Sequence, residues 1–599
     1  MAHTQAWRYS LLVRYCGLVL LLSALQACSS QTDLDSEKLK VEDSASIQAI
    51  MIEKSAADPT PEEASRFLMQ ATFGPKESEI TALDASSMDA WLSSQFAMSR
   101  QSHYDYVWNL RTQGVDVDNF VNTYAIESFW KQAITGDDQL RQRTTWALSQ
   151  IFVVGDMDNV RNSAYYDLLA ENAFGNYRTL LEKVTLSPAM GQWLSHIGNQ
   201  KEDLATGRLP DENYAREVMQ LFSIGLWQLN VDGTRKLDAS NQPIPTYTQD
   251  DIRGMAKVLT GWSYANCNVA QEPWYCIDGA RNGWYRIYDN TPNHSPAPLP
   301  LVKTEVYRDV TKQMMPMAAY HSTTEKKIVG GIILPAGRTA EQDLKDALDT
   351  LANHPNVGPF IGRQLIQRLV KSNPSPAYVG RISAVFANNG QGIRGDLKAV
   401  IKAILLDPEA RDIAQASTTT AGKLREPVLR LSHYLRAFTV PNGASPRYDL
   451  NPWWMDEVFS QRPLSSRSVF NFYSPSYLPP GEMSANNAVG PEFQIYHEST
   501  LVDSHNYIEY WVTNDPSTDT TNLPSFKHNY AAYTALANNP TALVDKLNLI
   551  LTSNTLSPEA RTSMITAVTN VPAGTNQARD RFRMAIMLFE ISPDYLIQK

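Results

Sequence analysis

Polar side chains recur at helical spacing in the segment DENYAREVMQLFSIGLW, residues 211–227. Asn213, Arg216 and Glu217 are spaced so that an α-helix would place all three on one face. Glu212 and Arg216 form an i, i+4 pair in the order that stabilises a helix. The pattern predicts a helix with one polar face. That face is either an ordinary solvated surface or a buried network of charged groups.

A second polar stripe follows in TYTQDDIRGMAKVLTGW, residues 246–262. Thr248 and Asp251 have the spacing of a capping box, so we expect a helix to begin there. Asp250 and Arg253 would share one side of that helix. If this side lay against the polar face of the preceding helix, the two would line a charged cleft. The alternative is two independent solvated faces.

His321 and Lys326 lie in MAAYHSTTEKKIVGG, residues 317–331. A histidine can act as a general acid or base near neutral pH, and a nearby lysine can supply positive charge. A lone histidine in a loop is more often simply hydrogen-bonded, and that alternative stays open.

These residues together suggest one catalytic hypothesis, a hydrolase that uses Glu217, Asp250 and His321. Paired carboxyl groups can divide acid and base roles when their environments separate their pKa values. In this hypothesis the residues that bind the ligand or hold the network are Glu212, Asn213, Arg216, Arg253 and Lys326.

The sequence contains none of the compact signatures of known active sites. It has no HExxH zinc motif, no GxSxG nucleophile elbow, no CxxCH haem attachment site, no P-loop and no EF-hand loop. Its 10 histidines are scattered, with no pair at metal-ligand spacing. The sequence therefore predicts no metal site and leaves any cofactor unknown.

Aromatic residues gather in two segments of the chain. One is WYCIDGARNGWYRIY, residues 274–288, and the other is VFNFYSPSY, residues 469–477. Such rings can stack on sugar rings, which makes a glycan a candidate partner. They can equally anchor a core or a loop.

The elements that must position these residues have mostly helical periodicity. In QLRQRTTWALSQIFVV, residues 139–154, apolar side chains recur on one face, and further helices are expected at residues 360–369, 396–406 and 540–552. Strand signals are few: VDGT at residues 231–234 predicts a hairpin turn, and residues 283–289 predict a strand. We expect a mainly α protein, a large multi-helix body with small β-hairpin insertions in one or two subdomains.

The N-terminus has the pattern of an export signal. Arg8 and Arg14 form a basic start, a short apolar run follows, and the sequence LQAC ends at Cys28. This order predicts a lipoprotein signal peptide over residues 1–27 with Cys28 as the acylated residue. The alternatives are a plain signal peptide with an incidental cysteine, or a short anchor. Residues 28–61 would then form a flexible acidic tether between the lipid in the membrane and the body.

The charge of the chain bears on its partners. The formal net charge is −10, and it becomes −12 if Arg8 and Arg14 leave with the signal peptide. An acidic chain without a basic cluster argues against nucleic acid as a partner.

Two cysteines remain to be explained. Cys16 lies in the expected signal peptide and Cys28 in the lipid site, which leaves Cys267 and Cys276. In an exported protein such a pair most simply forms one disulfide. A metal pair is the weaker alternative, because neither CxxC spacing nor a nearby histidine accompanies it.

The body is too long for one small core and divides by composition into three parts. Residues 62–265 form an N-terminal helical subdomain that carries the NYARE and YTQDD motifs. Residues 266–335 form an aromatic insertion tied by the disulfide, and residues 336–599 form a C-terminal helical subdomain.

Several motifs in fixed order resemble one known family. They are ASRFLMQATFGP (64–75), NYAREVMQLFSIGLW (213–227), YTQDDIRGMAKVLTGW (247–262), HPNVGPFIGRQLIQRLVKSNPSPAYVGRISAVF (354–386), LREPVLRLSHYLRAF (424–438) and SVFNFYSPSYLPP (468–480). Together they resemble the large exported bacterial proteins of the domain-of-unknown-function family number 1800. The resemblance implies export and, for many members, a gene beside that of a second exported family that resembles metal-dependent alkaline phosphatases and sulfatases. Such a protein is therefore a candidate partner. The resemblance implies no established reaction. Resemblance to lipoproteins further implies that Ser29, after the acylated cysteine, favours the outer membrane.

The chain departs from the family pattern at two positions. Asp211 stands where the family usually has asparagine before Glu-Asn-Tyr-Ala-Arg-Glu. Ser322 follows His321 where the family often has aspartate, while Lys326 stands at the family's lysine position. If that aspartate is a ligand or a base in relatives, this protein lacks it.

Two functions follow as expectations. The first is an outer-membrane-anchored envelope lipoprotein that binds or assembles an exported partner or an envelope ligand. The second is a hydrolase that acts on a glycan or another envelope polymer through the Glu/Asp/Arg/His cluster. Convergence of these side chains in one pocket would favour the second, and their separation would favour the first.

Overall fold

The computed structural model describes residues 58–117, 122–267, 276–277, 309–412, 414, 418, 421–443, 447–450, 452–513 and 526–599. Within these residues the protein is mainly α, as predicted, and its strands occur only as short antiparallel pairs. The expected lipid site at Cys28 and the strand expected at residues 283–289 lie outside the described residues.

The first part of the chain is a run of helices, several of which begin at a residue whose side chain caps the helix. Thr60 caps the first with a complete capping box, and Ser87, Ser102 and Asp158 cap later ones. The bounds are α3 Pro61–Ala71, α4 Glu77–Asp84, α5 Met88–Ala97, α6 His103–Thr112, α7 Thr123–Thr135, α8 Gln139–Ser149, α9 Asn159–Asn172, α10 Tyr177–Thr185 and α11 Pro188–Trp193.

The middle of the chain carries the two polar motifs and their neighbours. Its α-helices are α12 Asn213–Gln220, α13 Gln249–Val258, α14 Ala340–Asn353, α15 Val357–Leu369, α16 Pro376–Ala387, α17 Leu397–Leu406 and α18 Pro408–Arg411. Two short 3-10 helices, η2 Ala318–Tyr320 and η3 Val329–Gly331, lie in the connection before α14.

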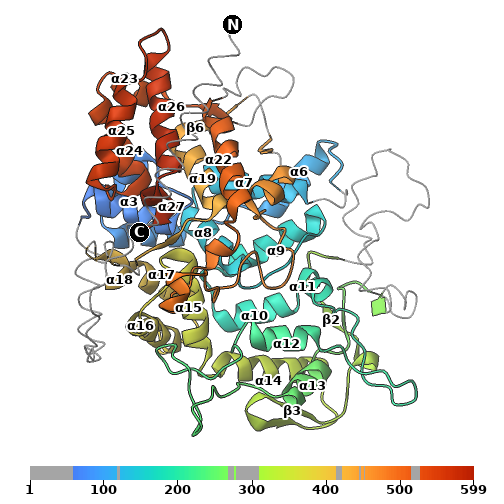
Figure 1. Ribbon diagram of the computed structural model, residues 1–599. Coiled ribbons are helices and arrows are strands. Elements are labelled where there is room, and N and C mark those ends of the chain that lie inside the picture. Colours follow the sequence, from blue (N-terminus) through green and yellow to red (C-terminus); the bar gives the residue numbers. More distant parts are fainter. Residues whose placement is uncertain are drawn as a thin grey trace.

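The C-terminal part of the chain lies beside its first helices. Its helices are α19 Pro427–Phe438, α20 Pro452–Phe459, α21 Glu482–Ala485, η5 Pro491–Gln494, α22 Glu498–Thr513, α23 Ala531–Leu536, α24 Pro540–Thr552, α25 Pro558–Thr569, α26 Gln577–Glu590 and α27 Pro593–Leu596. Figure 1 places α23 to α26 near α3 at one end of the molecule, and α12 to α14 at the opposite end.

Three of the four strand pairs join segments that are far apart in the sequence, and the fourth, β3 with β4, is a local hairpin. β1 Trp262–Ser263 pairs with β2 Met315–Pro316, and β3 Lys326–Ile328 with β4 Ile332–Leu334. β5 Lys423–Leu424 pairs with β8 Ile597–Gln598, and β6 Thr439–Pro441 with β7 Phe526–His528. The predicted turn at residues 231–234 is present: Gly233 has φ +78°, and isolated bridges such as Leu229 to Arg235 flank it.

The hydrophobic core of the described residues is continuous from α3 to α27. Helix α3 packs against α8, α17 and α24, so the beginning and the end of the chain share this core. The division at residues 62–265, 266–335 and 336–599 therefore stays a prediction from composition.

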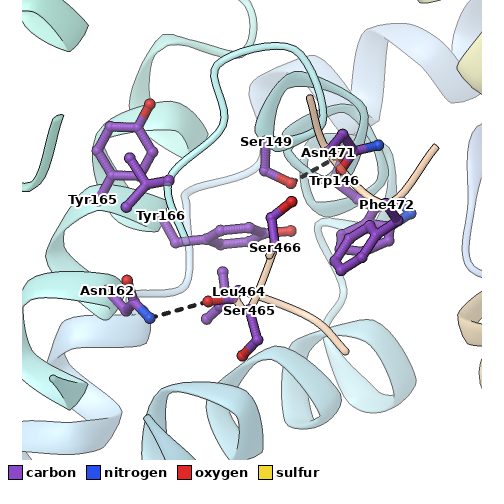
Figure 2. A pocket seen from close by; sticks show the side chains of 11 residues that line it. Trp146, Ser149, Asn162, Tyr165, Tyr166, Leu464, Ser465, Ser466, Asn471 and Phe472 are labelled. Carbon is purple, nitrogen blue, oxygen red and sulfur yellow. Dashed lines mark hydrogen bonds between the residues drawn. The ribbon is translucent and has the colours of Figure 1, made fainter. Parts of the chain in front are cut away.

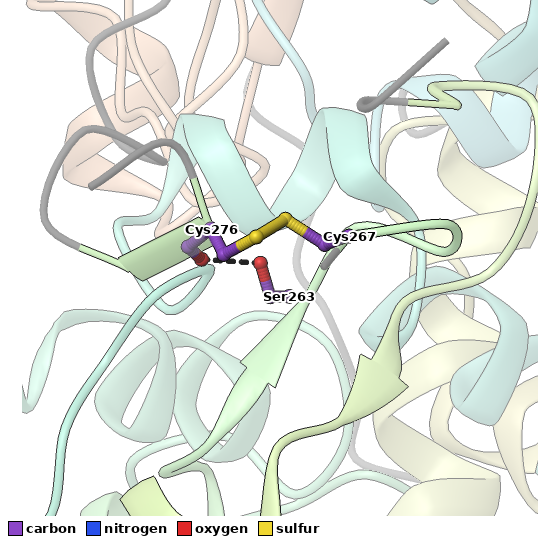
Figure 3. Close-up of a disulfide and its surroundings, with 3 residues drawn as sticks. All are labelled: Ser263, Cys267 and Cys276. Atoms are coloured by element: carbon purple, nitrogen blue, oxygen red, sulfur yellow. Dashed lines mark hydrogen bonds between the residues drawn. A yellow bond between two sulfur atoms is a disulfide. The ribbon is translucent and has the colours of Figure 1, made fainter. Parts of the chain in front are cut away.

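The predicted disulfide between Cys267 and Cys276 is present (Figure 3). The two Cα atoms are 5.6 Å apart, within the usual range for a disulfide. Ser263 of β1 donates a hydrogen bond to the carbonyl oxygen of Cys276, which ties the bridge to the β1–β2 pair.

The helices of the described ranges differ from membrane-spanning helices. None of them combines the length and the apolar character that a membrane span requires.

Candidate functional site

Helix α12 lies within the segment where the sequence predicts a helix. The Asp211 carboxylate accepts a hydrogen bond of 2.8 Å from the Asn213 backbone N–H, so it satisfies one free donor at the helix start. Arg216 Nη2 lies 3.3 Å from Glu212 Oε2, which is the predicted i, i+4 pair. Both side chains are partly exposed, so this pair stabilises the helix by only about 0.3 kcal/mol.

Glu217 differs from its neighbours on the polar face because it is buried. Only 6% of the residue is exposed, and its Oε2 atom has no hydrogen-bond partner among the described residues. Burial raises the pKa of the Glu217 carboxyl, and the positive charge of Arg216 opposes that shift only in part. The Tyr247 hydroxyl donates to Gln220 at 3.3 Å. Burial raises the pKa of Tyr247, and the nearby charge of Glu217 raises it further.

Helix α13 confirms the predicted capping box of Thr248 and Asp251. Gln249 Nε2 donates to Glu212 Oε2 at 2.8 Å and so joins the two helices at their polar edges. Asp250 and Arg253 are 3.2 Å apart but face solvent, with side chains 67% and 64% exposed. The two polar faces therefore meet at one hydrogen bond and do not enclose a charged cleft.

Glu202, which belongs to none of the motifs in the sequence, links α13 to the segment after η2. Its Oε1 accepts hydrogen bonds from Thr324 at 2.7 Å and Ser322 at 3.0 Å. Lys257 of α13 donates to the same Thr324 hydroxyl at 3.0 Å. Ser322 thus stabilises this connection, at the position where the family often has aspartate.

His321 and Lys326 are brought together by a third residue, Asp343 of α14. Lys326 Nζ lies 2.7 Å and His321 Nε2 lies 3.2 Å from the same carboxylate oxygen, while Arg338 Nε lies 2.6 Å from the other. Burial alone would raise the pKa of Asp343, but hydrogen bonds from His321 and Lys326 hold it below its usual value. The second ring nitrogen of His321 lies 2.9 Å from the Thr260 carbonyl oxygen.

This arrangement matches the simpler expectation for His321, a buried and hydrogen-bonded histidine. Both ring nitrogens have partners, and Lys326 also donates to the carbonyl oxygens of Ser322 and Thr324. The structure thus separates the three proposed catalytic side chains: Glu217 is buried in α12, Asp250 faces solvent, and His321 is locked against α14.

A second buried cluster, which no motif in the sequence indicated, lies between α8, α15 and α19. Glu426 is completely buried, and its Oε2 accepts hydrogen bonds from Trp146 at 3.0 Å, Gln150 at 2.9 Å and Gln461 at 2.8 Å. Its Oε1 lies 3.3 Å from Lys423 Nζ. Burial would raise the pKa of Glu426, but the charges of Lys423 and other cations lower it overall.

The cluster holds more positive than negative charge. Arg143 and Arg368 are buried beside Lys423, whereas only Glu426 and Glu492 are negative. Desolvation lowers the pKa of both arginines and raises that of Glu492. The sequence held one signal for this cluster, because Arg143 is a charged residue within a mostly buried helix. The apolar stripe of residues 139–154 outweighed that signal in the prediction.

A narrow cavity adjoins this cluster between α8, α9 and residues 464–472 (Figure 2). Figure 2 shows Tyr166 across the middle of the cavity with Ser466 beside it. The cavity has room for about one water molecule. Phe472, from the aromatic segment 469–477, stacks on Trp146 with ring centroids 6.2 Å apart and so serves as a core anchor.

Comparison with known proteins gives one match. The family described as a protein of unknown function (DUF1800) matches residues 66–597. No curated protein and no solved structure matches the chain significantly.

Proposed function

This chain belongs to the DUF1800 family, which has no assigned function, and we propose that it is an envelope lipoprotein that binds and assembles an exported partner protein. The lipid at Cys28 would hold it in the outer membrane, and residues 28–61 would give the body freedom to reach its partner. Both features follow from the sequence pattern at the N-terminus.

One observation carries the proposal: the polar motifs form an open surface. We call this surface the signature face and define it as Glu212, Arg216, Asp250 and Arg253, which lie on or beside α12 and α13 and whose side chains are between 32% and 67% exposed. Surface charges of both signs steer a partner and select against wrong ones more than they add affinity.

Exposed apolar side chains lie in the loop before this surface. Leu204 is 91% exposed and Leu209 is 76% exposed. The loop is joined to α13 through the contact of Glu202 with Lys257, 3.7 Å apart. Apolar anchors beside a charged rim are the composition of a protein interface.

The identity of the partner comes from the family resemblance. Many members of the family that the chain resembles are encoded beside an exported protein similar to alkaline phosphatases and sulfatases, and we take such a protein as the occupant of the signature face. The hydrolase alternative has less support, because Glu217, Asp250 and His321 have separate environments instead of a common pocket.

A photo-crosslinking experiment in cells tests the proposal. A crosslinking amino acid at Asn213, which is exposed at the start of α12, should form an adduct with the phosphatase- or sulfatase-like protein. The same amino acid at the exposed Asn570 is the matched control and should not. Arg216→Glu with Arg253→Glu should abolish the adduct, whereas Lys345→Glu with Arg579→Glu should keep it. An adduct that is absent at Asn213, or equally strong at Asn570, would contradict the proposal.

A further inference from the structure

A cleft of about 320 Å³ opens between α6, α9, the turn from α10 to α11 and residues 310–313. Its volume lies within the range of small-molecule sites. No motif singled out from the sequence contributes to it, and neither does the signature face.

The cleft has a fixed wall at the start of α6. The Asp167 carboxylate of α9 accepts hydrogen bonds from Ser102 Oγ at 2.5 Å, from His103 N at 2.8 Å and from Tyr104 N at 3.1 Å. Arg100 lies 2.9 Å from both Asp167 and Glu171. A wall held by so many polar contacts is organised before any ligand arrives.

The charges that line the cleft balance. Three are positive and three are negative: Arg100, Lys183, Lys312, Asp105, Asp167 and Glu171. A balanced site has no net attraction for a phosphate or another anion, but it offers many donors and acceptors. Among the described residues, Lys183 and Asp105 have no ion-pair partner and so remain available to a ligand.

Tyr104 adds an aromatic surface to the polar wall. Its ring lies 5.9 Å from that of Trp108, with the two planes 22° apart, so the tyrosine ring is held in place. It is only half-buried and lines the cleft. A flat aromatic ring next to charged hydrogen-bonding groups suits a molecule with an apolar face and hydroxyl groups at its edge.

We propose that this cleft binds a neutral sugar ring of an envelope glycan. The ring face would pack on Tyr104, and the hydroxyl groups would donate to the Asp105 carboxylate and accept from the Lys183 ammonium group. This site is independent of the partner-binding proposal, because it uses none of the residues of the signature face.

Isothermal titration calorimetry on the full mature chain in detergent micelles tests the site. The probes are chitotetraose, cellotetraose and maltotetraose, with tetra-alanine as a peptide probe. We expect at least one oligosaccharide to bind and tetra-alanine not to bind. Tyr104→Ala and Lys183→Met should each weaken the binding about tenfold, since each removes one contact of ordinary strength.

Two control variants make the outcome decisive. Tyr104→Phe keeps the ring and should retain the affinity, whereas Tyr510→Ala removes an exposed tyrosine outside the cleft and should change nothing. Arg216→Glu should leave sugar binding unchanged, so failure here and failure of the partner proposal are distinguishable. Binding of tetra-alanine alone, absence of any oligosaccharide binding, or equal affinity in Tyr104→Ala would overturn the site.

Discussion

The buried carboxyl of Glu217 lowers the stability of the folded chain when it is ionised. Its Oε2 atom has no hydrogen-bond partner among the described residues, and burial raises its pKa. The pKa of Glu217 is higher in the folded chain than in the unfolded chain. The stability that this group contributes at low pH is therefore lost as the pH rises through the folded pKa. A carboxyl kept in such a place is a candidate for function.

We expect Glu217→Gln to stabilise the protein at pH 7 by about 1 kcal/mol, since an amide has no charge to desolvate. At a pH below both pKa values the variant and the parent should have equal free energies of unfolding. Urea denaturation at the two pH values measures this difference. A loss of stability at pH 7 would show that the carboxylate has a stabilising partner.

The contribution of Asp343 to stability depends on pH in the opposite direction. Its pKa is lowered by His321, Lys326 and Arg338, so its contribution is complete above the unfolded value of about 4 and is lost as pH falls through the folded pKa. Asp343→Asn leaves the buried Lys326 without its counter-ion and should reduce the free energy of unfolding at neutral pH by about 3–5 kcal/mol.

Denaturation across pH 3 to 7 checks the Asp343 prediction, and the difference between parent and variant should shrink toward acid. Asp346→Asn is the matched control: it contacts the same Arg338 but is far more exposed, so its effect should stay below about 1 kcal/mol. Equal effects of the two variants would contradict the structural role of the buried carboxylate.

At the scale of elements, the Glu426 cluster joins α8 and α15 to the start of α19. Glu426→Gln removes one of two negative charges beside three buried cations and should destabilise the protein by about 3–5 kcal/mol.

The double variant Lys423→Met with Glu426→Leu removes charges of both signs and should be less destabilised than the sum of its single variants. A double-mutant cycle in urea measures the coupling, and strict additivity would count against the network.

Local signals made some elements predictable. The capping box at Thr248 and the helix at Pro540–Thr552 follow from residues that are neighbours in the chain. The helix over the NYARE motif was predicted as well, but periodicity says which side chains share a face and not how far that face is covered. The burial of Glu217 depends on its surroundings, and the pairing of His321 with Asp343 depends on α14, so neither has a local signal.

At the scale of the whole molecule, distant segments complete each other. β5 at Lys423–Leu424 pairs with β8 at Ile597–Gln598, the last strand of the chain, and α24 packs on α3. Composition and periodicity predicted a helical body, but they carry no information about such pairings. The continuous core of the described residues therefore could not be derived from the sequence, whereas the helical class could.

The attachment of the whole molecule to a membrane is the property that the N-terminal pattern predicts most directly. If Cys28 is acylated, the parent chain should sediment with outer membranes and partition into detergent, because two or more acyl chains hold a protein far more firmly than one. Cys28→Ser should release the protein into the soluble periplasmic fraction, whereas Cys16→Ser, within the signal peptide, should not. Fractionation with mass spectrometry of the mature N-terminus measures both effects. Membrane attachment that survives Cys28→Ser would show that another segment anchors the chain.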